Sequence, residues 1–158
     1  MKLFQHILVA TDFSACAALA VDVAVDLAQQ FGAKLTLLHV FEPPLQYDMG
    51  WSYPIPPMVD LQAVDEQALE AELERLRARF PAIEAVSSSG SAWRRILAIA
   101  KARGADLVVM GTHGRHGLPR ALLGSVAEKV VRMSEVPVLT VRLPGAAEAP
   151  EKVADSAA

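Results

Sequence analysis

The sequence has little of three features that mark other classes of protein. Only one of its 158 residues is a cysteine, Cys16, so the chain cannot close an internal disulfide, which fits a reducing cytosol. The longest apolar stretch, residues 15–28, is interrupted by Asp22 and Asp26, and no run reaches the roughly 18 residues that a membrane-spanning helix needs. The apolar segment after Lys2 is too short for a secretory signal core. We therefore expect a soluble, cytoplasmic protein.

A strong excess of one charge is also missing, since the formal net charge is -3. This balance argues against a protein that coats nucleic acid through a general basic surface. The charge is nevertheless unevenly distributed: residues 1–80 carry 5 basic and 11 acidic side chains, whereas residues 81–142 carry 9 basic and 4 acidic ones. We expect an anionic ligand, if there is one, to bind the second half of the chain.

Apolar runs of strand length alternate with segments of helical periodicity along the chain. Strands are predicted at 4–12, 34–41, 82–87, 105–110 and 136–142, and helices at 15–31, 60–80, 92–103 and 126–133. This alternation predicts an α/β fold in which residues 1–143 form a single doubly wound domain, a parallel sheet with helices on both faces. The polar-interrupted strand 82–87 is expected at a sheet edge. Residues 144–158, rich in alanine and charge, are expected to form a disordered tail.

One segment interrupts this rhythm. Residues 42–60 hold half of the ten prolines, both tyrosines and one of the two tryptophans, which excludes a regular helix or strand. A long loop in a compact domain is often functional, so a lid or a partner contact is one interpretation. A variable excursion without a function is the other.

Candidate site residues follow the first and the fourth predicted strand. The first strand ends in Thr11 and Asp12, and the fourth runs into a glycine-rich segment, residues 111–125. Glycines allow backbone amides to approach an anion closely, and Gly124 precedes a helix whose free N–H groups favour phosphate. Positive charge is available from two side chains of the same segment, Arg115 and Arg120. Together these features predict a polyphosphate site at the carboxyl ends of the strands.

Two common nucleotide-binding motifs are absent. The glycine-rich segment contains no lysine, so it does not fit the P-loop pattern, and no Gly-x-Gly-x-x-Gly follows the first strand. A P-loop GTPase and a nicotinamide dehydrogenase are therefore both disfavoured. No nucleophile stands with a base that the sequence can identify, since Cys16 falls in the apolar stripe of a helix.

Several of these residues also have structural interpretations. Ser125 and Glu128 fit a helix capping box, and Asp12 is a possible cap for the first helix. His113 and His116 have the spacing of a weak metal motif, without nearby carboxylate or cysteine ligands, and otherwise are loop residues or donors to a phosphate. At this stage both interpretations stay open for each residue.

The glycine spacing is specific enough to indicate a family. Gly111-Thr-His-Gly114 is followed by nine residues, 115–123, and then by Gly124-Ser125. In this spacing the sequence resembles the ATP-binding branch of the universal stress protein family, and the resemblance extends from Ile7 to Val141. It implies a five-stranded parallel sheet of the adenine nucleotide alpha hydrolase-like type.

The resemblance also implies a ligand and the residues that contact it. ATP, bridged by Mg²⁺ or Mn²⁺ at its phosphates, would have its adenine near Asp12 and Val40 and its nucleoside near Met110 and Gly111. The remaining implied positions are Ala10, where relatives often have proline, and those on the phosphate side: His113, Gly114, Arg120, Gly124, Ser125 and Val126. Relatives commonly form homodimers through the last strand, here residues 136–142. The sequence departs from the family pattern at Trp93-Arg94-Arg95. Either the two arginines bind an anion or a partner, or their side chains are simply exposed to solvent.

The function expected from the residues and the resemblance is that of a regulatory, stress-response module. Bound ATP would change its conformation or its choice of partner, with at most slow hydrolysis. Two alternatives remain. One is a dimeric adaptor that binds no nucleotide, and the other is a true ATPase or adenylate-using enzyme. The His-x-Gly-His pattern that related nucleotidyltransferases carry after the first strand is absent.

Overall fold

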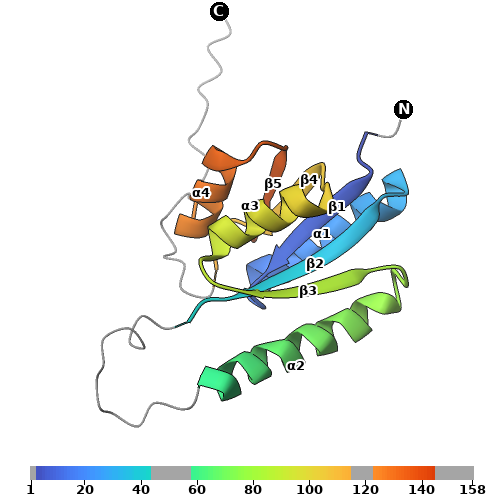
Figure 1. Ribbon diagram of the computed structural model, residues 1–158. Coiled ribbons are helices and arrows are strands. Elements are labelled where there is room, and N and C mark those ends of the chain that lie inside the picture. Colours follow the sequence, from blue (N-terminus) through green and yellow to red (C-terminus); the bar gives the residue numbers. More distant parts are fainter. Residues whose placement is uncertain (1–2, 44–57, 115–122, 145–158) are drawn as a thin grey trace, which may run out of the picture.

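The computed structural model describes residues 3–43, 58–114 and 123–144, and it has the predicted α/β architecture (Figure 1). The strands are β1 (His6–Thr11), β2 (Lys34–Phe41), β3 (Glu84–Ser89), β4 (Leu107–Gly111) and β5 (Val138–Val141). The helices are α1 (Ala15–Phe31), α2 (Met58–Arg77), α3 (Ala92–Arg103) and α4 (Ser125–Met133). All strand pairs are parallel, in the order β3-β2-β1-β4-β5. The five-stranded parallel sheet is thereby confirmed.

The sheet is covered on both faces, and the strand residues alternate between two hydrophobic clusters. Ile7 and Val9 of β1 pack into a cluster with side chains of α1 and α2, whereas Leu8 packs into a second cluster with α3 and α4. All three side chains are fully buried. A strand buried on both faces needs no polar alternation, which is why β1 reads as a continuous apolar run.

The ends of α1 and α3 lie where the sequence predicts them. Ser14 is the N-cap of α1, and its hydroxyl accepts a hydrogen bond from the Ala17 amide at 3.2 Å. Gly32 and Gly104 end α1 and α3 in the left-handed conformation, with φ values of 60° and 65°. A residue without a Cβ adopts this conformation at the lowest cost, so glycine is the common helix terminator.

Other boundaries differ from the predicted ones. The helix predicted at 60–80 spans Met58–Arg77 instead, because the chain turns before Pro81, whose ring disfavours a helical conformation in the preceding residue. The strand predicted at 82–87 is shifted to Glu84–Ser89, although its edge position is confirmed. The last strand is shorter than predicted and starts after Pro137, which has no N–H to donate to the ladder.

Three predictions concern residues outside the described ranges. They are the role of most of the loop 42–60, the contribution of Arg115, His116 and Arg120, and the disorder of the tail after residue 144. Within the described parts of the chain, no helix is long and apolar enough to cross a membrane.

Candidate functional site

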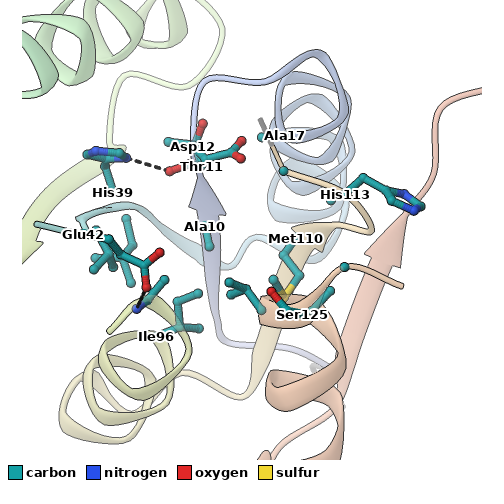
Figure 2. Close-up of a pocket in the computed structure, with 18 of the residues that line it drawn as sticks. Ala10, Thr11, Asp12, Ala17, His39, Glu42, Ile96, Met110, His113 and Ser125 are labelled. Carbon is teal, nitrogen blue, oxygen red and sulfur yellow. Dashed lines mark hydrogen bonds between the residues drawn. The ribbon is translucent and has the colours of Figure 1, made fainter. Parts of the chain in front are cut away.

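The carboxyl ends of β1, β2 and β4 open into a cavity of about 720 Å³ (Figure 2). The cavity lies where the strand order reverses, because β1 has β2 on one side and β4 on the other. A ligand site at this switch point is the general rule for doubly wound sheets. Helices α3 and α4 direct their N-terminal ends toward it, and α2 contributes Leu61, Val64 and Asp65 to the wall.

The fold brings most of the predicted site residues together. Ten of them line this cavity: Ala10, Asp12, Val40, Met110, Gly111, His113, Gly114, Gly124, Ser125 and Val126. The eleventh, Arg120, lies outside the described residues. Segments that are about 100 residues apart in the sequence meet here because β1 and β4 are neighbours in the sheet.

Asp12 is held by the backbone turn that follows β1. Its Oδ1 accepts a hydrogen bond from the Ser14 amide at 3.0 Å, so Asp12 precedes the helix cap and is not the cap itself. Phe13, between the two, has a φ of 62°, unusual for a residue with a side chain. Its amide donates to the Thr11 hydroxyl at 3.1 Å, and its ring packs on His39 with the ring centroids 4.5 Å apart. These contacts stabilise a strained turn that fixes the carboxylate at the end of the strand.

The start of α4 differs from the predicted capping box. Gly124 is the N-cap, and Ser125 is the first helical residue, so the capping-box interpretation of Ser125 is wrong. The reason is a backbone contact: the Gly124 amide donates to the Thr112 carbonyl at 2.7 Å, which closes the glycine-rich segment one residue earlier. Glycine supplies no side-chain acceptor, so the N-cap residue itself makes no side-chain hydrogen bond to the amides of the first turn of α4.

The glycines of the motif are also required by contacts within the chain. A Cβ on Gly111 would lie 3.0 Å from Cys16 Sγ, and one on Gly114 would lie 2.6 Å from Asp12 Oδ2. A Cβ on Gly124 would lie 3.0 Å from the Thr112 carbonyl oxygen. The pattern therefore has a packing explanation beside the ligand explanation, because two strand ends and two helix starts converge on this corner.

His113 lies at the edge of the cavity. Its Nδ1 is 3.0 Å from the Thr112 hydroxyl, and its ring points away from Asp12 and Ser125 (Figure 2). In the parts of the chain that the structure describes, no three His, Cys, Asp or Glu side chains come together as a metal site.

Sequence reasoning missed an ion pair on the opposite side of the cavity. His39 is buried, with its Nδ1 2.9 Å from the Thr11 carbonyl oxygen and its Nε2 2.8 Å from Asp65 Oδ2. The Thr11 carbonyl only accepts, so Nδ1 is the donor in the first contact, and the second contact joins Nε2 to the Asp65 carboxylate. The pair fastens α2 to the end of β1. The two residues are 26 positions apart, and no local pattern connects them.

Glu42 was also missed, and it accounts for the unusual charge of the first turn of α3. Its Oε1 accepts a hydrogen bond from the Ala92 amide at 2.7 Å, which places a carboxylate at the positive end of the helix dipole. The guanidinium carbon of Arg94 lies 5.1 Å from the centre of the Trp93 ring, and Arg95 Nε donates to Ser88 Oγ at 2.7 Å. The acid that the first turn of α3 lacks is thus supplied by the end of β2.

The chain was then compared with known proteins. The profile of the Universal stress protein family matches residues 3–142. Universal stress protein A homolog 1 of Coxiella burnetii is 33% identical over 141 residues, which cover 87% of this chain and 96% of that protein. The solved structure of hypothetical protein MJ0577 aligns with a TM-score of 0.74 at 26% identity, over 89% of this chain and 97% of its own.

A further solved structure is that of a universal stress protein in complex with cAMP. It aligns with a TM-score of 0.67 at 28% identity, over 88% of this chain and 97% of its own. The family profile covers most of the chain, and the sheet order and the position of the cavity were established independently of it. This chain belongs to the universal stress protein family.

Proposed function

We propose that the protein binds ATP in this cavity and acts as a nucleotide-dependent regulatory module. One observation carries the proposal: the first turn of α4, which has no side-chain cap, opens into the cavity next to the glycines that follow β4. Backbone amides and the helix dipole together favour a phosphate chain at this end. The apolar residues Ala10, Val40 and Met110 offer contacts for the nucleoside.

Asp12 would face the adenine side of bound ATP, where its role is to orient the ligand rather than to attack it. One carboxylate oxygen is engaged by the Ser14 amide, so its position is set before the ligand arrives. A divalent cation, Mg²⁺ or Mn²⁺, would neutralise phosphate charge and would be held by ATP and water. Any hydrolysis is proposed to be slow. We place this module in the cytoplasm, where ATP is available.

The test adds a negative charge at the proposed phosphate site without weakening the helix. Ser125→Asp puts a carboxylate in the first turn of α4, which the helix dipole favours, while the same charge repels phosphate. We expect calorimetry to show ATP affinity reduced about 100-fold or more, with an unchanged or higher melting temperature. The matched control is Ser91→Asp, which adds the same charge at the N-cap of α3 and should alter ATP affinity less than about threefold.

Mass spectrometry of the purified protein provides an independent readout. We expect an adenine nucleotide to be released from the wild-type protein on denaturation and to be lost from the Ser125→Asp variant. A wild-type protein that carries no nucleotide and gives no calorimetric signal with ATP would contradict the proposal.

A dimeric adaptor without nucleotide is the second candidate, and the close contacts of Gly111, Gly114 and Gly124 favour it. These glycines have packing roles that need no ligand. Both candidates share the proposal of a homodimer through residues 136–142. Among the described strands β5 is paired only with β4, and Leu139 on it is 37% exposed. Leu139→Lys is expected to shift the mass in solution, measured by light scattering, from dimer toward monomer, because a charge would enter the interface.

A further inference from the structure

The cavity receives the N-terminal ends of two helices, and these ends are completed in different ways. At α4 the N-cap is Gly124, which offers no side-chain acceptor. At α3 the N-cap Ser91 makes no side-chain cap bond either, yet the Ala92 amide donates to Glu42 at 2.7 Å. Among the described residues, one helix end is thus capped without a side-chain acceptor, and the other already holds a carboxylate.

Main-chain contacts bring Glu42 to this place. Phe41, the last residue of β2, pairs with Ser89 of β3, and the Gly90 amide donates to the Phe41 carbonyl at 2.9 Å. The end of β2 is therefore joined to the turn between β3 and α3. Glu42, which follows Phe41, is thereby placed within hydrogen-bond distance of the Ala92 amide. The first turn of α3 contains no acidic residue of its own. Glu42 is the carboxylate that the dipole of α3 and the hydrogen bond hold at the cavity wall.

The two ends of the cavity consequently differ in charge. In Figure 2, Glu42 and Ser125 lie on opposite sides of Ala10, which marks the end of β1, while Ile96 and Met110 contribute apolar surface between them. The α4 end presents partial positive charge from backbone amides. The Glu42 end presents a full negative charge, which attracts N–H and O–H donors and repels anions.

We propose that Glu42 is a specificity-determining residue that restricts the cavity to nucleotides carrying all their phosphates at the 5′ end. This inference rests on the proposed function, because it assumes that the phosphate chain lies at α4. With the chain there, the nucleoside extends toward Glu42. A second phosphate on the ribose would then enter the negative end of the cavity, where it meets a like charge.

Two isomeric ligands isolate this effect. ADP and adenosine 3′,5′-bisphosphate have the same molecular formula. ADP carries both phosphates at the 5′ position of the ribose, whereas the bisphosphate carries one at the 5′ position and one at the 3′ position. Glu42→Gln keeps the shape of the side chain and an oxygen that accepts from the Ala92 amide, and it removes the charge. Glu84→Gln is the matched control, since Glu84 is an exposed carboxylate paired with Arg103 outside the cavity.

We expect calorimetry on the wild-type protein to show ADP bound more tightly than adenosine 3′,5′-bisphosphate. Glu42→Gln should reduce this preference about tenfold, mainly by strengthening the binding of the bisphosphate, and the change should diminish at high salt. Glu84→Gln should leave the preference within about twofold. Thermal unfolding of each variant checks that the fold is retained.

Other results would overturn the inference in distinguishable ways. If the wild-type protein binds ATP and ADP, but Glu42→Gln leaves the preference unchanged or strengthens both ligands equally, Glu42 does not set specificity and the proposed function stands. If the wild-type protein binds none of the three nucleotides, the proposed function fails, and the role of Glu42 fails with it.

Discussion

The two sides of the cavity are built from different parts of the chain. The α4 side consists largely of main chain: the glycines after β4, the Gly124 cap and the first-turn amides of α4. The other side, around the end of β2, consists of side chains that other elements hold in place: His39 with Asp65 of α2, and Glu42 with the Ala92 amide of α3. A main-chain site recognises the shape and charge of a phosphate chain, whereas a side-chain site discriminates between ligands by charge and hydrogen-bond direction.

The largest effect on stability should come from the side around the end of β2, at the His39–Asp65 pair. His39→Ala removes a buried ring and leaves the Thr11 carbonyl without its donor, so we expect a loss of about 2–3 kcal/mol in the free energy of unfolding. Asp65→Ala should cost less, because that side chain is 17% exposed.

Urea denaturation of the two single variants and the double variant measures how strongly the pair is coupled. We expect the two losses to be non-additive by about 1 kcal/mol or more, as for residues in direct contact. Strictly additive losses would show that the pair does not fasten α2 to the sheet.

A smaller effect is expected on the α4 side, at Gly114. A Cβ there would lie 2.6 Å from Asp12 Oδ2, so Gly114→Ala should displace the carboxylate and cost about 1–2 kcal/mol of stability. The same substitution combined with Asp12→Ala should cost less, because the oxygen that the new methyl group meets is gone. Equal costs in both backgrounds, measured by thermal unfolding, would mean that Gly114 is required for another reason.

The smallest effects on stability are expected at the N-terminal ends of α3 and α4. Glu42→Ala removes the acceptor of the Ala92 amide and should cost about 1 kcal/mol, as the loss of a helix cap does, whereas Glu42→Gln should retain most of it. Ser125→Ala should stay within about 0.5 kcal/mol, because Ser125 is not the cap of α4. A large cost for Ser125→Ala in chemical denaturation would contradict the assignment of Gly124 as the cap.

Sequence patterns predicted the fold and the α4 side well. Continuous apolar runs mark strands buried on both faces, and the periodic helices ending in Gly32 and Gly104 were located to the residue. Ten of the eleven site residues that the family resemblance implied line one cavity, although their contacts with a ligand stay a prediction. These predictions succeed because main-chain structure follows local rules: burial on two faces, and glycine where a side chain would not fit.

The charge pattern gave a coarser prediction. The excess of positive charge in residues 81–142 is partly spread over the outer surface of α3 and α4, in ion pairs such as Arg132 with Glu128 and Lys101 with Glu135. Only some of it therefore remains for a ligand. A sum along the chain does not say which charges face the cavity, because neutralising partners come from residues far apart in sequence.

The sequence by itself determined the parallel sheet, the helices that cover it and the glycine-lined corner at the ends of β1 and β4. The tertiary structure alone decided that Gly124 rather than Ser125 caps α4, that Asp65 pairs with His39, and that Glu42 supplies the acid missing from α3. The physical reason is the range of the interactions. Periodicity and glycine geometry act within a few residues, whereas each of these three contacts joins groups that only the packing of separate elements brings together.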